Sequence, residues 1–269
     1  MKQNSIKALS IQIRLSGLSF CILNRSTNTI EWLNHVRLDK KASPFELLNE
    51  LKNVVESNSL FEQTFNTITC VYQNELSCLV PKAVFNENNL ADYLKFNAKI
   101  LKTDFISYDE LSTIQSMNVY VPLVNINNYI FDTFGSFEYK HSSTILIESL
   151  LQLGSKFSGE KLHINVNKNT FEIVYVKNLE LIFYNTFEYQ SKEDFIYYIL
   201  FTVEQLKLDP ETIKTVLSGS IETTDDDYSI LYKYIRFVDF IHPNYDYKFK
   251  TDINTSASHN DFILLNSFN

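Results

Sequence analysis

Apolar and polar residues alternate at the start of the chain and predict a group of strands. Ala8 to Leu23 alternates with period 2 on either side of Ser16-Gly17, which is typical of two strands joined by a tight turn. A third strand is predicted over Thr29 to Leu38. The segment Ser43-Pro44-Phe45-Glu46 has the residues of a capping box and begins an amphipathic helix, and Thr67 to Tyr72 is a further strand. The predicted order of elements is β-β-β-α-β.

The same order recurs in the second half. Lys161 to Tyr189 contains three predicted strands, with a turn at Asn167-Lys168-Asn169. Ser191 to Asp194 is an S-x-x-D variant of the capping box and begins a helix. Ile213 to Leu217 is then a strand, which ends at Ser218-Gly219. The repeated order indicates a duplication, although three strands followed by a helix are common enough to arise by chance.

The remaining patterns add elements to both halves. Further strands are predicted over Leu79 to Val80, Phe105 to Tyr108, Asn118 to Pro122, Ser136 to Tyr139, Tyr245 to Lys250 and Asp261 to Asn266. Further helices are predicted over Asn89 to Ala98, Ser142 to Lys156 and Asp226 to Phe240, with a short helical or turn segment after Asn125. We therefore expect an α/β protein of two related domains, residues 1–124 and 125–269.

Composition and charge exclude several classes of protein. With 45% hydrophobic residues the chain has enough material for a core, which excludes disordered and fibrous proteins. The net charge of −8 gives no general attraction to nucleic acid or to anionic membranes. The 16 tyrosines and 21 phenylalanines could stack on bases, but an acidic chain lacks the positive groove that such binding needs. Exposed aromatic residues are instead predicted to mark contacts with another protein.

The apolar segments and the cysteines indicate a cytoplasmic protein. The longest apolar runs, such as Phe195 to Val203, are shorter than the roughly 20 residues that cross a bilayer. The N-terminal residues contain no unbroken apolar stretch of the kind found in a secretion signal. Cys21, Cys70 and Cys78 lie in apolar, strand-like surroundings and are predicted to be reduced thiols of the core. We expect no membrane insertion.

Glycine is scarce, and its positions exclude two kinds of nucleotide site. The chain has only 5 glycines. None forms a G-x-x-x-x-G-K-[ST] or G-x-G-x-x-G motif, which excludes a P-loop and a standard Rossmann site. The scarcity alone also fits an AT-rich genome, since residues with GC-rich codons are generally few in this chain.

Three other groups of residues suggest chemistry, and each has a simpler structural interpretation. The acids of Glu222 to Asp227 could bind a divalent cation, but acids are also favoured at a helix N-terminus. His141 precedes two serines, which suggests a nucleophile, but there is no G-x-S-x-G motif and capping of the helix explains the residues better. His163 and His35 lie on predicted strands and are interpreted as outward-facing or hydrogen-bonded residues of a sheet.

Several segments resemble known families. Two β-β-β-α-β halves, each opened by a hairpin, are similar to the duplicated ribonuclease-H-like plan of the actin, Hsp70 and sugar-kinase superfamily. Ser191 to Gly219 resembles the corresponding part of the pilus-assembly family PilM. Residues 9–23 (LSIQIRLSGLSFCIL), 79–85 (LVPKAVF), 105–111 (FISYDEL) and 118–151 resemble more closely a bacterial family, domain of unknown function 3822, known mainly from Bacteroidetes. The resemblance implies an actin-like fold with two subdomains around a cleft, and no established activity.

Active members of that superfamily hold Mg²⁺ and ATP at D-x-G hairpin turns, and this chain departs from the pattern. The aspartates hold the metal and the glycines cradle the phosphates. In the first turn, Arg14-Leu15-Ser16-Gly17, Arg14 stands in place of the acid. In the second turn, Asn165 replaces the acid and Asn167 replaces a glycine. Ser218-Gly219, at the place of a glycine pair that contacts adenosine, retains part of the pattern.

The resemblance therefore implies at most the remnant of a nucleotide site. Its residues are Ser16, Gly17, Asn165, Asn167, Ser218 and Gly219. The simpler interpretation of the same residues is two ordinary hairpin turns. We expect no cofactor, because the loss of both acids is hard to reconcile with turnover of ATP.

These observations predict a protein that acts by binding rather than by catalysis. Its partner is predicted to be another protein or a peptide, bound in the cleft or at an exposed sheet edge. A divergent ATP-binding protein with weak or no hydrolysis, and with Mg²⁺ as a further ligand, is the alternative. A structural homo-oligomer is a third interpretation, and the sequence leaves the oligomeric state open.

Overall fold

The computed structural model describes residues 5–96, 98–154, 159–243, 245–251, 253 and 259–269. These residues form two compact units, which we describe separately. The first unit comprises Met1–Leu146, Tyr245–Thr255 and Ile263–Asn269. The second comprises Ile147–Asn244 and Ser256–Phe262.

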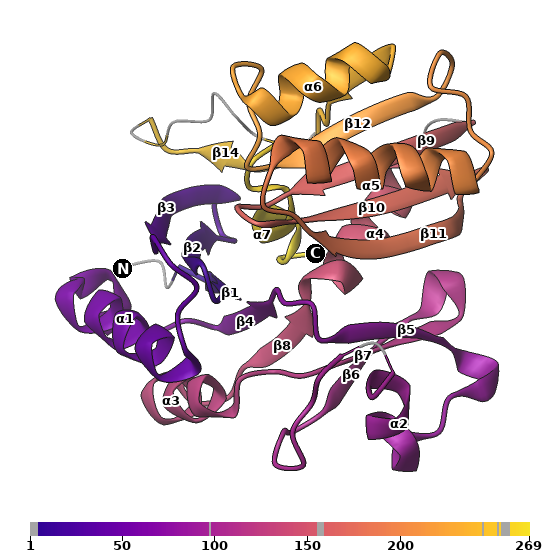
Figure 1. The fold of residues 1–269 in the computed structure, drawn as a ribbon. Coiled ribbons are helices and arrows are strands. Elements are labelled where there is room, and N and C mark those ends of the chain that lie inside the picture. The colour runs from indigo at the N-terminus through magenta and orange to yellow at the C-terminus, as the bar shows by residue number, and fades with distance from the viewer. Residues whose placement is uncertain (1–4, 97, 155–158, 244, 252, 254–258) are drawn as a thin grey trace. The chain divides into compact units, whose positions relative to one another are not determined.

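A six-stranded sheet forms the centre of the first unit (Figure 1). Its strands, in spatial order, are β14 (Lys248–Phe249), β3 (Thr29–Arg37), β2 (Gly17–Asn24), β1 (Lys7–Arg14), β4 (Thr67–Tyr72) and β8 (Glu138–His141). The first three strands of the chain pair antiparallel, whereas β4 pairs parallel with both β1 and β8. The strands of this sheet confirm the predicted meander and its parallel return strand.

Helices cover both faces of the six-stranded sheet because its strands bury side chains on both sides. On one face, the strands pack against the apolar sides of α1 (Pro44–Ser57) and α3 (Val124–Phe134), which bury Leu47, Leu51 and Ile126. On the other face lie Leu264 and Leu265 of α7 (Phe262–Asn266). The predicted strand at Asp261 to Asn266 is therefore wrong, since a short apolar run has the same composition in a buried helix as in a buried strand.

The second unit repeats this sheet. Its five strands, in spatial order, are β11 (Glu180–Glu188), β10 (Thr170–Lys177), β9 (Glu160–Val166), β12 (Lys214–Gly219) and β13 (Phe237–Phe240). Three antiparallel strands are followed by two parallel ones, as in the first unit. The common order and direction of the strands confirm the duplicated ribonuclease-H-like plan.

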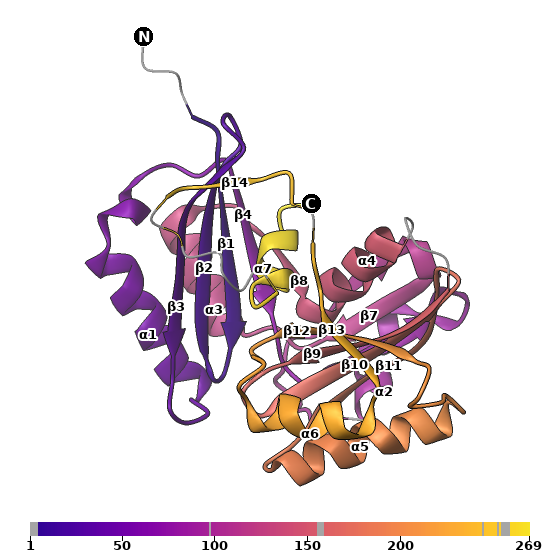
Figure 2. The same cartoon turned by 90° about the horizontal axis from the view of Figure 1, so that it is seen from above.

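Helices also lie on both faces of the five-stranded sheet (Figure 2). Helix α5 (Lys192–Gln205) and α6 (Asp226–Tyr234) share one apolar cluster with β9, β10 and β12. The other face has the part of α4 (Ser142–Gly154) that belongs to this unit. The predicted helix over Asp226 to Phe240 is too long, because its last residues form β13, which pairs with β12.

A separate three-stranded sheet is inserted in the first unit between β4 and α3. Its strands, in spatial order, are β5 (Ser77–Pro81), β7 (Ser116–Tyr120) and β6 (Ser107–Leu111), and α2 (Leu90–Leu94) packs on it. The described part of the first unit also contains four short 3₁₀ helices: Ser59–Glu62, Lys82–Val84, Glu87–Asn89 and Ser112–Ile114. This sheet places β6 at an outer edge, and that edge is important for the candidate site below.

Local signals for helix starts are confirmed in both units. Ser43 caps α1, and Glu46 completes the capping box that the sequence predicts. Ser191 caps α5 in the same way, with Asp194 as the reciprocal acid. These motifs are readable from sequence because all their hydrogen bonds lie within four residues.

Candidate functional site

The hairpin at the start of the first unit is explained by sheet geometry. Arg14, at the position of the missing acid, donates from Nη2 to Ser19 Oγ at 2.8 Å. Ser16 lies in the turn, where its carbonyl oxygen accepts from the Leu38 backbone N–H at 2.9 Å. Gly17 has φ +146°, and a Cβ there would lie 2.1 Å from the Val36 carbonyl oxygen. Glycine is therefore required at position 17 by the close approach of β3, whether or not a ligand binds.

In the second unit, Asn165 and Ser218 meet across β9 and β12. The Ser218 hydroxyl donates to Asn165 Oδ1 at 2.9 Å, and Asn165 Nδ2 donates to Glu172 Oε2 at 2.6 Å. All three side chains are buried, with at most 4% of any of them exposed. Both ends of the Asn165 amide are thus used inside the sheet, and a buried carboxyl group lies beside them.

Gly219 is also explained by close contact between strands. It has φ +83°, and a Cβ there would lie 2.1 Å from the Val166 carbonyl oxygen. That oxygen accepts from the Ser220 N–H at 2.7 Å, and the Gly219 N–H donates to the His259 carbonyl at 2.9 Å. The residue allows the end of β12 to lie close against its parallel neighbour β9, a role that needs no nucleotide.

Asn167 differs from these residues because part of its side chain has no partner. Its backbone N–H donates to the Thr170 carbonyl at 2.8 Å and closes the β9–β10 turn. Its φ does not lie in the positive region that favours glycine. Its side-chain Nδ2 is buried without a hydrogen-bond partner among the described residues. Asn167 thus presents a buried, unused donor.

These residues do not fit Mg²⁺ with ATP. The fold places Asn165, Asn167, Ser218 and Gly219 together in the second unit, whereas Ser16 and Gly17 belong to the first. At the two motif positions the metal would meet Arg14 and an amide already bonded on both sides, rather than carboxylate oxygens. Within the described ranges, no three His, Cys, Asp or Glu side chains are grouped so as to hold a metal ion.

Other residues singled out in the sequence have structural roles. Cys21 and Cys70 are buried free thiols, and Cys78 is a partly buried one, as predicted. Asp225 lies at the N-cap of α6, and the acids that follow lie in its first turn. His35 Nδ1 lies 2.9 Å from Ser19 Oγ, which makes it a hydrogen-bonded sheet residue.

An open groove of about 400 Å³ lies within the first unit between the edge strands β6 and β8. It is lined by residues 107–110, by residues 137–140 and by Thr144. Successive side chains of a strand point to opposite faces of its sheet. A groove that touches four consecutive residues from each segment must therefore follow the backbone edges rather than one face. Sequence patterns could not indicate this site, because β6 and β8 belong to different sheets.

Asp109 joins the two edges of the groove. One carboxylate oxygen accepts from the His141 backbone N–H and from the Thr144 hydroxyl, both at 2.7 Å. The other accepts from the Tyr120 hydroxyl at 3.0 Å. Burial raises the pKa of Asp109 even though these three donors act in the opposite direction. The carboxylate therefore holds the inserted sheet against β8 and the start of α4.

His141 supports the same junction from the interior. Its Nε2 lies 3.1 Å from the Asn74 carbonyl oxygen, which can only accept, so Nε2 carries the proton. Its Nδ1 then accepts from Ser143, whose hydroxyl lies 2.7 Å away and whose N–H lies 3.2 Å away. Burial lowers the pKa of His141 to about 4. Because His141 Nδ1 accepts from the Ser143 N–H at the start of α4, the His-Ser pair caps the helix, as predicted. Ser143 is fully buried and offers no accessible nucleophile.

The backbone of β8 turns polar groups toward β6. The Tyr139 carbonyl oxygen lies 3.4 Å from the Tyr120 hydroxyl, and the His141 N–H points the same way, to Asp109. The N–H and C=O of one strand residue point to the same side, so the Tyr139 N–H is also directed into the groove. Among the charged side chains that line it, Asp109, Glu110 and Glu138 outnumber Lys140. The groove can therefore accept an extended chain. Of its acids, Glu110 is paired with Lys82 at 2.6 Å and Asp109 is held in the junction described above.

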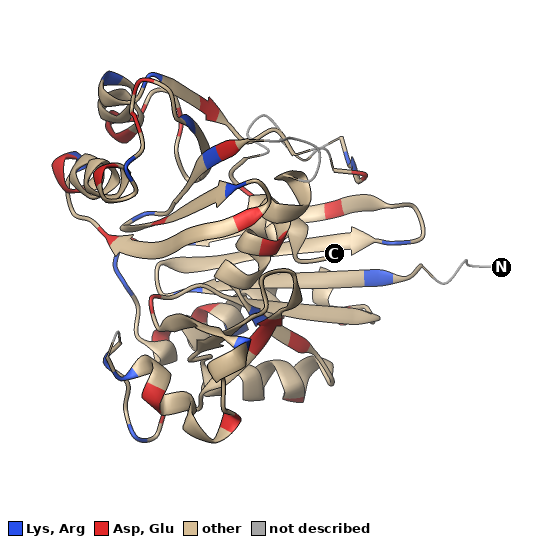
Figure 3. Cartoon of the chain, turned by 90° about the vertical axis from the view of Figure 1, so that its right-hand side faces the viewer, with Lys and Arg blue, Asp and Glu red and all other residues tan. Residues whose placement is uncertain are grey.

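Lys and Arg are scattered among Asp and Glu along the helices, strands and loops of the chain (Figure 3). Within the described residues, no helix is long and apolar enough to cross a membrane. Exposed aromatic side chains do occur on α5 and α6, among them Tyr197, Phe201 and Tyr232.

Comparisons with known proteins agree with the fold. A family model described as "Protein of unknown function (DUF3822)" matches residues 1–238. A crystal structure from Bacteroides thetaiotaomicron VPI-5482, of a protein with actin-like ATPase fold and unknown function, has a TM-score of 0.82 and 20% identity. The match covers 98% of this chain and 96% of that one. No curated protein matches the sequence.

A second solved structure is the PilM-PilN type IV pilus biogenesis complex. The match covers 97% of this chain and 97% of that one, with a TM-score of 0.59 and 11% identity. Together with the strand order of the two sheets, these structures confirm the expected actin-like fold.

Proposed function

The chain belongs to the DUF3822 family, and from its structure we propose that it is a non-catalytic protein-binding module. The partner segment lies in extended form in the groove of the first unit, along the edges of β6 and β8. The observation that carries this proposal is the pair of facing strand edges, because an open edge pairs with an added strand through main-chain hydrogen bonds.

The Asp109 junction supports this role. A binding edge must be held in place before the partner arrives, because ordering it on binding would cost affinity. Asp109 provides that order through bonds to β8, to β7 and to α4.

The fold itself is compatible with a protein partner. PilM, which has the same fold, is found in a complex with PilN. We extend that kind of role to this chain, without extending the identity of the partner. The free cysteines fit a reducing compartment, so we place the protein in the cytoplasm.

A divergent ATP-binding protein is the second candidate, and one observation favours it. Asn167 has a buried, unused side-chain donor at the turn where phosphates lie in active relatives of this fold. Against it, the neighbouring Glu172 carboxyl group is buried beside Asn165, and an ionised carboxylate there would repel phosphate. We therefore expect calorimetric titration with Mg²⁺ and ATP to give no heat at millimolar ATP. Micromolar affinity would instead establish the second candidate.

Site-specific photo-crosslinking tests the groove. A benzoylphenylalanine at the exposed groove position Glu138 should crosslink to a partner in the native host, whereas the same residue at Glu193 on α5 should not. The crosslinked segment, made as a peptide, should bind the purified chain directly. If the two positions crosslink to the same proteins, the groove is not the binding site.

A proline variant then tests the strand pairing. Tyr139→Pro removes the N–H that faces the groove without removing a bond to β4, because edge residues alternate in direction. Tyr139→Ala loses the same ring and keeps the N–H. Peptide binding should be weaker in the proline variant by about tenfold, or about 1.4 kcal/mol. Equal affinity for both variants would contradict main-chain pairing along β8.

A further inference from the structure

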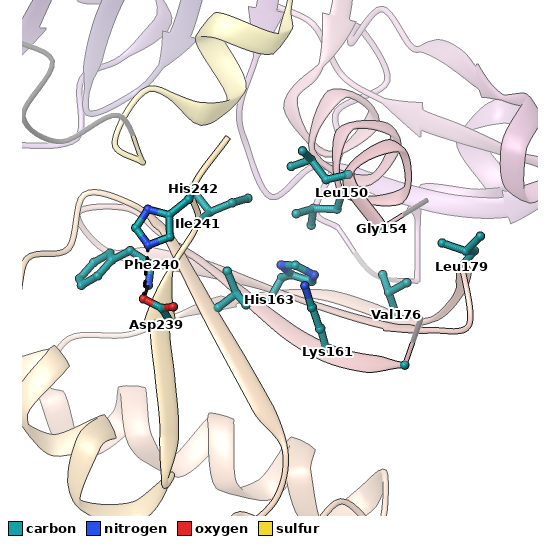
Figure 4. A pocket seen from close by; sticks show the side chains of 13 residues that line it. Leu150, Gly154, Lys161, His163, Val176, Leu179, Asp239, Phe240, Ile241 and His242 are labelled. Atoms are coloured by element: carbon teal, nitrogen blue, oxygen red, sulfur yellow. Dashed lines mark hydrogen bonds and ion pairs between the residues drawn. The ribbon is translucent and has the colours of Figure 1, made fainter. Parts of the chain in front are cut away.

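A second pocket lies wholly within the second unit, on the sheet face opposite α5 and α6 (Figure 4). Its volume is about 230 Å³. The end of α4 forms one wall, and β9, β10, β12 and β13 form the others. This pocket shares no residue with the groove between β6 and β8.

Most of the exposed surface in the pocket is apolar. The aliphatic side chains come from α4, β10 and β12, from the turn after β10 and from the residue after β13: Leu150, Leu153, Val176, Val216, Leu179 and Ile241. Such a lining favours an apolar ligand body, since apolar area leaves water when it is filled.

His163 is the polar group on the pocket floor. It lies on the central strand β9, and its ring faces the pocket (Figure 4). Its Nδ1 is buried and has no hydrogen-bond partner among the described residues. Burial, and then the charge of Lys161, lower the pKa of His163 to about 3, so the ring is neutral near pH 7. The sequence predicts an outward-facing or hydrogen-bonded histidine. The structure instead turns its ring into a pocket beneath α4 and leaves Nδ1 without a partner among the described residues.

Lys161 gives this end of the pocket a positive charge. It lies two residues before His163 on the same face of β9, and its side chain is directed toward the imidazole (Figure 4). The acid of the lining, Asp239, lies on β13, and its exposed carboxylate is 3.6 Å from Nε2 of His242, which follows the strand. The charge of Lys161 acts on His163 and favours an anion or a hydrogen-bond acceptor at this end of the pocket.

We propose that this pocket binds a small molecule with an apolar body and one carboxylate, whose oxygens lie between Lys161 and His163 Nδ1. A cavity of about 150 Å³ accommodates benzene, so the larger pocket here suits a ligand of about six to ten non-hydrogen atoms. The carboxylate satisfies the unpaired nitrogen and the apolar body covers the aliphatic wall. This site is independent of the protein-binding groove.

Hexanoate and its neutral isostere hexanamide test the proposal on the full chain by NMR titration at pH 7. Hexanoate should shift the His163 ring signals and the amides of Val176 and Val216 in a saturable way. It should bind at least about fivefold more tightly than hexanamide. No saturable shift up to 10 mM hexanoate, or equal affinity for the two probes, would overturn the proposal.

Variants locate the binding. Val216→Trp fills the pocket and should abolish the hexanoate shifts, and Lys161→Gln should weaken binding by at least about fivefold. Lys233→Gln, an exposed lysine on α6 at the opposite face of the sheet, is the matched control and should leave binding unchanged. Equal weakening by Lys161→Gln and Lys233→Gln would show a general charge effect and contradict the site. The wild-type comparison of the two probes remains decisive if Val216→Trp does not fold.

Discussion

Replacement of Asp109 should lower the stability of the groove more than replacement of any exposed acid of the inserted sheet. Asp109→Ala removes three hydrogen bonds to one carboxylate, from His141, Thr144 and Tyr120. Bonds to a charged group contribute about 1.5 kcal/mol or more each, and the cost of burying the carboxylate offsets part of the sum. We expect a loss of about 3 kcal/mol for Asp109→Ala. Asp109→Asn, which keeps one acceptor oxygen, should lose about 1 kcal/mol.

Hydrogen exchange gives a local measurement of this loss. The His141 amide, which donates to Asp109, should exchange about a hundredfold faster in Asp109→Ala, since 1.4 kcal/mol corresponds to a factor of ten. Asp92→Ala is the control, because Asp92 forms only an exposed ion pair with Lys95 and should change stability by about 0.5 kcal/mol or less. Unchanged protection of the His141 amide in Asp109→Ala would refute the role of this carboxylate.

The pH dependence of the Asp109 variants has a definite sign. Burial raises the pKa of Asp109 in the folded chain, so the folded state binds this proton more tightly than the unfolded state does. The stability contributed by Asp109 is therefore complete below the ordinary value of 3.8 and decreases as the pH rises through the higher folded pKa. The stability difference between wild type and Asp109→Asn should be larger at pH 3.5 than at pH 7. A difference that grows with pH would contradict burial as the dominant cause.

Two further predictions concern stability in each unit. Gly219→Ala should cost about 3 kcal/mol in urea unfolding, because left-handed strain of about 1–2 kcal/mol adds to the clash with the Val166 carbonyl. Gly159→Ala, at φ +122° with open space around its Cβ, should lose only the stability that corresponds to the backbone strain. Equal losses of stability in the two variants would disprove the clash at Gly219. The pKa of His141 is lowered to about 4 by burial, so the folded state favours the neutral ring and stability falls between pH 6.5 and 4, by about 3 kcal/mol at the lower end. In His141→Gln, the urea unfolding midpoint should decrease less between pH 6.5 and 4 than it does in the wild type. An unchanged decrease would mean that other groups cause the loss of stability.

The parts of the fold that sequence could predict are those determined by local contacts. The two capping boxes and the two β-β-β-α-β orders depend on residues close together in the chain, and all of them are confirmed. The errors lie where distant contacts decide. Phe262–Asn266 is a helix because it packs on the six-stranded sheet, and Phe237–Phe240 is a strand because β12 lies beside it. Neither partner is visible in the local pattern.

The candidate groove depends even more on distant contacts. Asp109 lies in an ordinary polar strand segment, and only the fold brings it to His141, 32 residues later in the chain. Its neighbours on β6, Tyr108 and Glu110, do not indicate that partner. The glycines at 17 and 219 show that a sequence match can also mislead. Their positions match a nucleotide motif, but close backbone contacts explain them fully.

Two open strand edges in one unit also affect how the protein must be kept in solution. The backbone groups that receive a partner segment in β-pairing are equally able to pair with a second copy of the same chain. Occupancy of the groove by its partner would therefore act as a shield against self-association. The concentration of the partner would then determine how much of this chain stays free of self-association and in solution.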